Sequence, residues 1–485
     1  MSLSRNTSYN LVGAMVPLLL SLVTVPLYLH LVGIERYGVL QIAWLLLGYF
    51  GLFDLGLGRA TAFRIAAQHE ASPSARAETF WSALVINIAM GLVGGALLWG
   101  AADYAFIDHA KVHAQLRAEM QISVPLLALS VPIATVTGVL TGALQGRERF
   151  LTTNAVSVTS TALFQLLPLF VAATRGPYLP ALLGGALAAR FLGVAILGGY
   201  CWLELCQGQR LRARVTTMRT LLGYGGWVTL TAIFGPMLVI VDRFAMSAML
   251  GMATVAVYSI PYNLASRIAV LPASLTNALF PRLSAATAED AREMGADATR
   301  VLLCIVTPPI MCAILGAQAF LQFWVGAKLG FAAAPVARLL VFAFWFNALA
   351  LVAFTRLQAK GRPDLVTKIL LVQIPPYWAA LYFGMTRFGL IGCALAFLSR
   401  MMLDFMMQSW VADGRILRWP QVMRDGGMLL IALVWAQFLI ARPLVYWPGA
   451  VGLMTLSVIV GWRDMPLLVR RRLTNGRSRR DTVFA

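Results

Sequence analysis

Charged residues are scarce in this sequence. Asp, Glu, Lys and Arg make up only 12% of its 485 residues, whereas a soluble globular domain averages about 25%. Apolar residues make up 59%. These values exclude a soluble protein. They also exclude nucleic-acid binding as the reason for the net charge of +19, because the basic residues punctuate apolar stretches along the whole chain.

Cysteine and histidine are also sparse, with five and four residues. The cysteines lie in or beside apolar segments and lack the spacing of a metal site. They are Cys201, Cys206, Cys304, Cys312 and Cys393. We therefore expect no disulfide, no metal and no cofactor.

Apolar windows recur throughout the chain, each long enough to cross a hydrocarbon layer about 30 Å thick. Fourteen windows predict fourteen transmembrane helices, at residues 8–32, 38–62, 79–102, 121–144, 151–174, 179–203, 220–247, 254–281, 299–323, 334–356, 365–386, 389–411, 426–441 and 446–462. The first window is longer than the apolar core of a signal peptide, so we expect it to stay in the mature protein. The fold class predicted is an all-α integral membrane protein.

The distribution of Lys and Arg predicts the orientation of these helices. If the amino terminus is cytoplasmic, 27 of the 39 basic residues fall in cytoplasmic segments and seven fall outside. Under the positive-inside rule, this bias places both ends of the chain in the cytoplasm. We expect the basic tail, residues 463–485, to contact anionic lipid headgroups.

A short motif recurs in the two halves of the chain. Residues 144–147 read LQGR and residues 357–362 read LQAKGR, and pairing Gly146 with Gly361 gives an offset of 215. Two further pairs have similar offsets: Gly33 with Gly251 at 218, and Arg190 with Arg400 at 210. These matches predict two six-helix bundles related by an axis along the membrane normal. The domains are then residues 1–219, 220–425, a pair of added helices at 426–462, and the tail.

Several motifs resemble those of bacterial oligosaccharide flippases of the polysaccharide transporter family. They are Asn10-Leu-Val-Gly, Leu31-Val-Gly-Ile-Glu-Arg-Tyr-Gly38, Phe53-Asp-Leu-Gly-Leu-Gly-Arg59, Gln145-Gly-Arg, Val241-Asp-Arg243 and Val257-Tyr-Ser-Ile-Pro261. The resemblance covers essentially the whole chain. It implies the fold of the multidrug, oligosaccharidyl-lipid and polysaccharide exporter (MOP) superfamily, which includes the MATE transporters.

The resemblance also implies a function and a location. Such a flippase moves undecaprenyl-pyrophosphate-linked oligosaccharide from the cytoplasmic to the outer leaflet of the bacterial inner membrane. Other membrane proteins of polysaccharide assembly are then expected partners. The protein would carry a glycan across the membrane without chemical change, so we expect no enzymatic activity.

Charges inside predicted spans are the candidates for substrate binding, because a charge in the bilayer usually faces a cavity or a partner. A polar stripe runs along the eighth span, at Ser259, Asn263, Arg267, Ser274 and Asn277. Arg59 and Arg64 end the second span, where a pyrophosphate would arrive. Arginine suits this ligand because its fork of donors matches phosphate oxygens. Arg190 and Arg400 either line the cavity or pair with Glu204 and Asp404.

Asp54 and Asp242 are the candidates for coupling transport to protons or Na⁺, since a membrane carboxylate can change its charge state. The alternative makes each carboxylate a permanent partner of an arginine.

Three other functions remain to be weighed. A MATE-like drug or cation antiporter should be poor in cavity arginines, and a flippase for the peptidoglycan lipid precursor shares the fold. An integral glycosyltransferase would need ordered acidic residues in an outside loop, which residues 103–120 do not offer.

Overall fold

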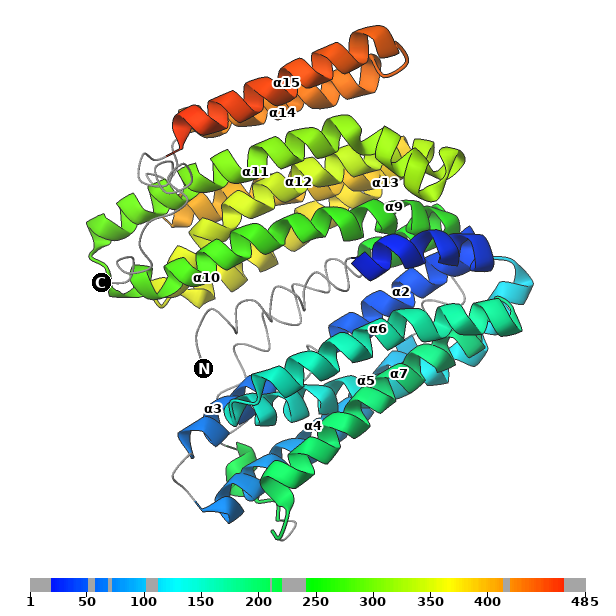
Figure 1. The fold of residues 1–485 in the computed structure, drawn as a ribbon, viewed down its shortest axis with the longest axis vertical. Coiled ribbons are helices and arrows are strands. Elements are labelled where there is room, and N and C mark those ends of the chain that lie inside the picture. Colours follow the sequence, from blue (N-terminus) through cyan, green and yellow to red (C-terminus); the bar gives the residue numbers. More distant parts are fainter. Residues whose placement is uncertain are drawn as a thin grey trace. The chain divides into compact units, whose positions relative to one another are not determined.

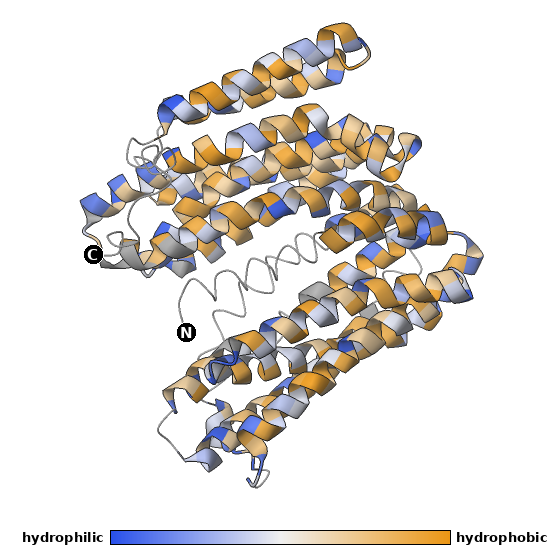
Figure 2. Ribbon diagram, in the orientation of Figure 1, coloured by the Kyte–Doolittle hydropathy of each residue, from blue (hydrophilic) through white to orange (hydrophobic). Residues whose placement is uncertain are grey.

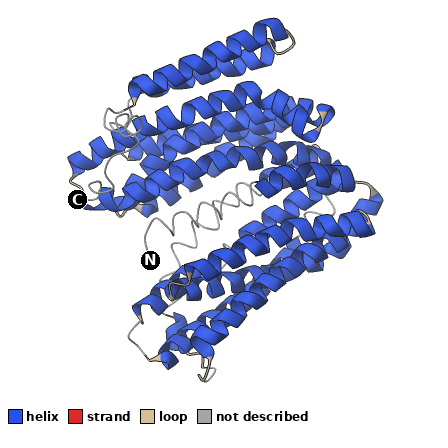
Figure 3. Ribbon diagram, viewed as in Figure 1, coloured by secondary structure: helices blue, strands red, loops and turns tan. Residues whose placement is uncertain are grey.

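The computed structural model describes residues 19–50, 57–68, 72–101, 112–209, 212–219, 241–412 and 419–465. Within these residues every regular element is a helix and no strand occurs (Figure 3). Eight of the described helices are long and apolar enough to cross a membrane. Hydrophobic residues predominate along the helices (Figure 2). The predicted all-α, multi-pass membrane fold is therefore confirmed.

The chain divides into two compact units, Met1–Ala256 and Val257–Ala485. The division falls within α9 (Met252–Ala265), beyond the bundle boundary predicted at residue 219. Residues 220–240 lie outside the described part of the chain. The predicted bundle limits therefore stay a prediction, as does the tail.

The first unit is a bundle built around a central helix, α5. Its described elements are Leu19–Val32, α2 (Ile34–Phe50), α3 (Leu57–Ala67), α4 (Pro73–Ala101), α5 (Ala114–Gly146), α6 (Phe150–Arg175), α7 (Leu179–Cys201), the π-helical turn η3 (Trp202–Cys206), the helical residues 215–219 and 241–249, and the start of α9. A β-carbon at Gly142 of α5 would lie 2.0 Å from the carbonyl oxygen of Gly58 in α3. Small residues thus let these backbones touch, as membrane helices often do.

The second unit packs around α11 and α12. Beyond α9 it contains the 3₁₀ turn η4 (Ser266–Ala269), α10 (Val270–Ala285), α11 (Ala288–Val325), α12 (Ala327–Ala359), α13 (Pro363–Val411), α14 (Trp419–Phe438) and α15 (Pro443–Asp464). The two added helices, α14 and α15, lie side by side and pack on α11 (Figure 1).

Helix α13 is a hairpin of two spans. Its backbone leaves the helical region at Gly389, where φ is 56° and ψ is −130°. This reversal brings Gln373 to within 2.8 Å of Asp404, although 31 residues separate them. The two spans predicted at 365–386 and 389–411 are therefore both present, and the turn falls where the second was expected to begin.

The helices extend beyond the predicted windows at their polar ends. Helix α11 begins at Ala288 rather than at residue 299, and the hydroxyl of Thr287 caps it by accepting the N–H of Asp290. The first turns of α11 carry Glu289, Asp290 and Arg292. Hydropathy marks the part of a helix that matches the bilayer, so it misses such extensions.

The turns that follow α5 and α12 have the same structure, which supports the duplication, but their residues correspond at a different offset from the expected 215. The N–H of Arg149 donates to the carbonyl of Leu144, and the N–H of Arg362 donates to the carbonyl of Leu357. Both turns contain a residue with positive φ, Glu148 at 60° and Gly361 at 70°. The offset is 213, so the predicted pairing of Gly146 with Gly361 is wrong by two residues.

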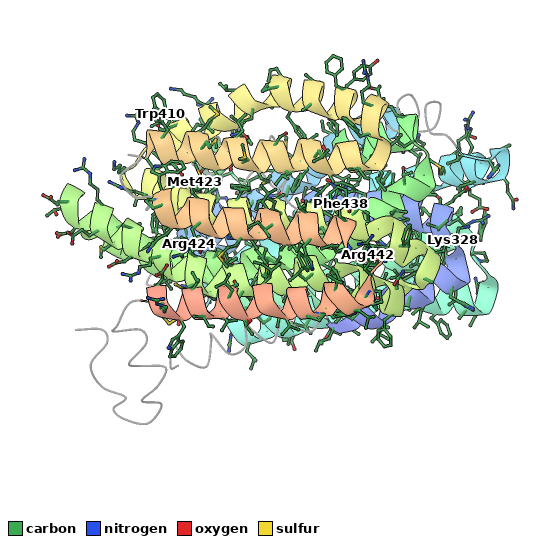
Figure 4. All side chains as sticks on the ribbon, turned by 90° about the horizontal axis from the view of Figure 1, so that it is seen from above. Lys328, Trp410, Met423, Arg424, Phe438 and Arg442 are labelled. Atoms are coloured by element: carbon green, nitrogen blue, oxygen red, sulfur yellow. The ribbon has the colours of Figure 1, made fainter. Side chains whose placement is uncertain are left out.

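The two ends of the second unit agree with the predicted alternation of loops. Lys328 and Arg442, both expected outside, lie at one end of the unit, and Arg424, expected inside, lies at the other (Figure 4). Gly326, which precedes α12 at the same end as Lys328, adopts a φ of 92° that permits the tight reversal from α11.

Candidate functional site

Five arginines lie within predicted spans, and two of them are buried, Arg243 and Arg338. Arg243 is 2% exposed, and its Nη1 lies 3.7 Å from Oδ2 of Asp242, which is 1% exposed. Arg338 of α12 donates to Gln437 of α14 at 3.2 Å and to Gln318 of α11 at 3.3 Å. Arg338 thus attaches an added helix to the bundle, a role that a hydrogen-bonded interior guanidinium can fulfil.

Two further arginines lie over aromatic rings. The guanidinium carbon of Arg190 is 4.6 Å from the ring centre of Phe164, and that of Arg400 is 5.2 Å from the ring centre of Tyr377. Phe164 and Tyr377 are 213 residues apart, the offset of the repeated turns. Each unit therefore places an arginine from its sixth span over an aromatic ring of its fifth, a favourable cation–π arrangement.

The acidic partners proposed for these arginines are not used. Glu204 pairs with Arg149 at 2.5 Å, and Asp404 accepts hydrogen bonds from glutamine amides. In the described part of the chain, neither Arg190 nor Arg400 has a carboxylate within 4 Å. The alternative of ion pairs with Glu204 and Asp404 is therefore wrong, and neither arginine forms an ion pair with a described carboxylate.

Arg400 opens into a pocket of about 260 Å³ within the second unit, whose lining includes Gln373, Tyr377 and Ser399. Among the described residues, Nε and Nη1 of Arg400 have no hydrogen-bond partner, and neither does Oε1 of the fully buried Gln373. A buried polar atom without a partner is unfavourable. These atoms offer both donors and an acceptor to a polar ligand.

Asp404, expected from the sequence only as a partner of Arg400, is a further functional candidate. Its carboxylate accepts the amide of Gln373 at 2.8 Å and the amide of Gln408 at 2.9 Å. It has no cationic partner within 4 Å in the described residues. Helical spacing could have grouped Arg400, Asp404 and Gln408, but nothing in the sequence alone brings Gln373 to them.

Arg267 lies where its helix is interrupted. The turn η4 replaces α-helix by 3₁₀ geometry at Ser266–Ala269, and Pro261 and Pro272 lie on either side. A 3₁₀ stretch inside a long helix often marks a hinge or strain. Both Arg267 and Asn263 are exposed, and Arg267 has no ion-pair partner within the described ranges.

The predicted polar stripe on this helix is partly corrected. Asn263, Arg267 and Ser274 are exposed as expected, but Ser259 is only 3% exposed. Ser259 lies in the packed part of α9, before the interruption. The side chain of Asn277 lies outside the described residues.

The candidates near the second span are only partly described. Arg64 is half-buried in the last turn of α3. Asp54 and the side chain of Arg59 lie outside the described residues. Asp242 has Arg243 as a neighbour, so both the coupling role and the structural role remain open for it.

No set of three His, Cys, Asp or Glu side chains gathers as a metal site among the described residues. The groups that do gather are guanidinium groups, amides and aromatic rings inside membrane helices. This fold and these groups define a class of protein: a helical membrane transporter built from two related halves, with cationic groups in its spans.

Comparisons with known proteins identify the family. The polysaccharide biosynthesis protein family matches residues 3–287, and the chain belongs to this family. A protein of Shigella flexneri named "Putative O-antigen transporter" is 28% identical over 417 residues, covering 85% of this chain and 98% of that protein.

Solved structures with the same fold come from the MOP superfamily. The inward closed conformation of the lipid II flippase MurJ matches with a TM-score of 0.72 and 12% identity, over 95% of this chain and 99% of that one. An inward-facing MATE multidrug resistance transporter matches with a TM-score of 0.69 and 13% identity, over 83% and 98%. These likenesses confirm the predicted superfamily fold.

Proposed function

We propose that this protein is a flippase that moves undecaprenyl-pyrophosphate-linked oligosaccharide from the cytoplasmic to the outer leaflet, for the synthesis of a cell-surface polysaccharide. It does so by alternating access and leaves the substrate chemically unchanged. The family assignment and the name of the Shigella relative support this proposal.

The observation that carries the proposal is the state of two intramembrane arginines. Arg267 and Arg400 have no acidic partner within 4 Å among the described residues. An uncompensated charge in a span is unfavourable unless a ligand or water reaches it. A pyrophosphate supplies the missing anion, and guanidinium groups bind its oxygens through paired donors.

The same observation separates the proposal from its alternatives. A MATE-like antiporter for cationic drugs would be opposed by Arg267 and Arg400, since like charges repel in a low-dielectric site. A peptidoglycan lipid-precursor flippase also handles a pyrophosphate, so the arginines do not disfavour it. The family match favours the oligosaccharide.

We also propose that an ion drives transport. Three carboxylates lie within predicted spans, Asp54, Asp242 and Asp404. Asp404 fits a proton or Na⁺ best, because amides rather than a cation surround it. An ion can drive the cycle only if its affinity differs between the inward and outward states.

The proposed location is the bacterial inner membrane, with both termini cytoplasmic. The basic-residue bias supports this orientation. The partners proposed are the lipid-linked oligosaccharide, anionic lipids at the basic tail, and other membrane proteins of polysaccharide assembly.

The test is reconstitution in liposomes with a fluorescent undecaprenyl-pyrophosphate-linked oligosaccharide, with leaflet position read by an impermeant quencher. Wild type should flip the probe. Arg267→Ala should reduce the rate by about 10- to 100-fold, as expected for a lost charge-assisted hydrogen bond of ~1.5–3 kcal/mol. Arg267→Lys should recover part of the rate, because it restores charge without the fork.

The matched control is Arg387→Ala, the same change at an exposed arginine beside the Gly389 turn. It should leave the rate unchanged. A wild-type protein that moves a cationic dye and not the lipid-linked probe would overturn the proposal. Normal flipping by Arg267→Ala would remove Arg267 from the site.

A further inference from the structure

The second unit contains an apolar cavity of about 370 Å³ that the arginine sites do not use. Pro261, Leu264 and Ile268 line one side, and Cys312, Gly316 and Phe320 of α11 line the other. Helix α12 contributes the remaining wall through Ala337 and Val341. The volume lies within the range of small-ligand pockets, about 300–1,000 Å³. No charged side chain lines it.

The interruption of the helix creates this cavity. Pro261 cannot donate a backbone hydrogen bond, and the 3₁₀ turn η4 follows it. On the facing helix, Gly316 leaves open space, since a β-carbon there would meet no atom within 4 Å. Small residues on α11 therefore face a helix that is not packed against them.

The cavity and the polar stripe occupy adjacent faces of one helix. Leu264 and Ile268 are four residues apart and share a face, which points into the cavity. Asn263 and Arg267 are also four residues apart, and both are exposed. Asn263 and Arg267 each come one residue before a cavity residue. The exposed polar face and the face that lines the cavity therefore differ by about 100° around the helix. A ligand with an anionic group and an apolar chain would match this pair of faces.

The depth of Arg267 indicates which lipid would fit. It lies fifteen residues after Met252, or about 22 Å along the helix at 1.5 Å per residue. Phe320, at the other end of the cavity, lies five residues before the end of α11 at Val325. The cavity therefore runs from the middle of the span toward the turns at Gly251 and Gly326, and Arg267 lies along the helix at the level of its deep end.

A resident phospholipid keeps its phosphate at the membrane surface, whereas this arrangement needs the phosphate within the hydrocarbon core. Only a lipid whose headgroup is in transit has its phosphate there. We propose that the cavity holds the first isoprene units of the polyprenyl chain while Arg267 binds the adjoining phosphate. This inference rests on the proposed function and assigns the place of the lipid chain during flipping.

Photo-crosslinking tests the inference. The protein is reconstituted in vesicles of phosphatidylethanolamine and phosphatidylglycerol with undecaprenyl phosphate that carries a photoreactive group near its phosphate. Crosslinked peptides should concentrate on residues 261–268 and 312–320. Gly316→Leu fills the cavity and should lower this labelling by about tenfold, equivalent to ~1.4 kcal/mol.

The matched control is Gly452→Leu, the same substitution in α15, where a β-carbon also meets no atom within 4 Å. It should label like wild type. Equal labelling of the cavity by photoreactive phosphatidylglycerol would overturn the inference, because it would identify a resident lipid site. Unchanged labelling of Gly316→Leu would overturn it as well.

The transport assay separates this inference from the proposed function. If wild type flips the lipid-linked oligosaccharide and the crosslinks lie elsewhere, the function stands and the cavity assignment falls. If the crosslinks form as expected but no oligosaccharide is flipped, the cavity binds polyprenyl phosphate and the proposed function falls.

Discussion

The fifth and sixth spans of the two units share an arrangement and differ in how closely they pack. Both place an arginine over an aromatic ring, Arg190 over Phe164 in the first unit and Arg400 over Tyr377 in the second. In the first unit the surrounding hairpin is closed, since a β-carbon at Gly193 would lie 2.6 Å from the hydroxyl of Ser160.

In the second unit the same location is open and polar. At the offset of 213, Ser160 corresponds to Gln373, Gly193 to Met406, and Phe191 to Asp404. Gln373 and Met406 line the 260 Å³ pocket beside Arg400. At this offset Arg190 corresponds to Leu403, so the two arginines occupy positions three residues apart in the repeat. Arg400 lines the pocket, whereas Arg190 lies in the closed hairpin. The two arginines should then respond differently to the same substitution.

The largest difference is expected for alanine substitutions of the two arginines. Arg400→Ala should slow flipping by about 10- to 100-fold, because the pocket loses a charge-assisted donor worth ~1.5–3 kcal/mol. Arg190→Ala should change the rate by less than about threefold and should mainly lower thermal stability. The flipping assay and a thermal melt in detergent measure both. Equal losses of transport would contradict the division of roles.

The next effect concerns the closed packing of the first unit. Gly193→Val should lower the free energy of unfolding by about 1–3 kcal/mol, as overpacking commonly does. Its β-carbon meets only the side chain of Ser160 within 4 Å, so Ser160→Gly in the same chain should recover most of the loss. Met406→Val, the counterpart in the second unit, should melt like wild type. Failure of the double variant to recover would place the strain elsewhere.

A smaller effect is expected at Asp404. Asp404→Asn keeps the size of the side chain and removes the charge, so flipping should lose its dependence on a proton or Na⁺ gradient and slow by about tenfold. Asp242→Asn is the comparison in the first unit, since Arg243 lies beside Asp242 at 3.7 Å. If Asp242→Asn removes the gradient dependence and Asp404→Asn retains it, the coupling site belongs to the first unit.

Hydropathy predicted the membrane fold, because it depends only on local composition. The spans at 365–386 and 389–411 were found even though one helical hairpin contains them. The end of a helix was harder to place, as at Thr287, because a polar extension outside the bilayer has no hydropathy signal.

The site was predictable only where it follows a single helix. Asn263 and Arg267 share a face by spacing alone, and the structure leaves both exposed. The surroundings of Arg400 were missed because Gln373 and Asp404 meet across a helical hairpin. The spacing of residues on one helix does not predict which residues of another helix face them. Glu204 was one of two alternatives expected for Arg190, but the guanidinium lies over the ring of Phe164, twenty-six residues earlier in the sequence.

The smallest effect on stability is expected at the repeated turn, where Glu148 of the first unit corresponds to Gly361 of the second. Glu148 adopts a φ of 60° where Gly361 adopts 70°, and left-handed backbone costs an L-residue roughly 1–2 kcal/mol. Glycine removes that cost but loses more entropy on folding, about 0.5–1 kcal/mol. Glu148→Gly should therefore stabilise the protein by about 0.5–1 kcal/mol in a thermal melt. The side chain of Glu148 is exposed, so no packing is lost.

Glu148→Gln removes the charge but keeps the backbone strain, and it should melt like wild type. Gly361→Ala should cost about 1 kcal/mol at the same position of the second unit. If Glu148→Gln stabilises as much as Glu148→Gly, charge rather than backbone conformation distinguishes the two turns, and their shared geometry has no energetic consequence.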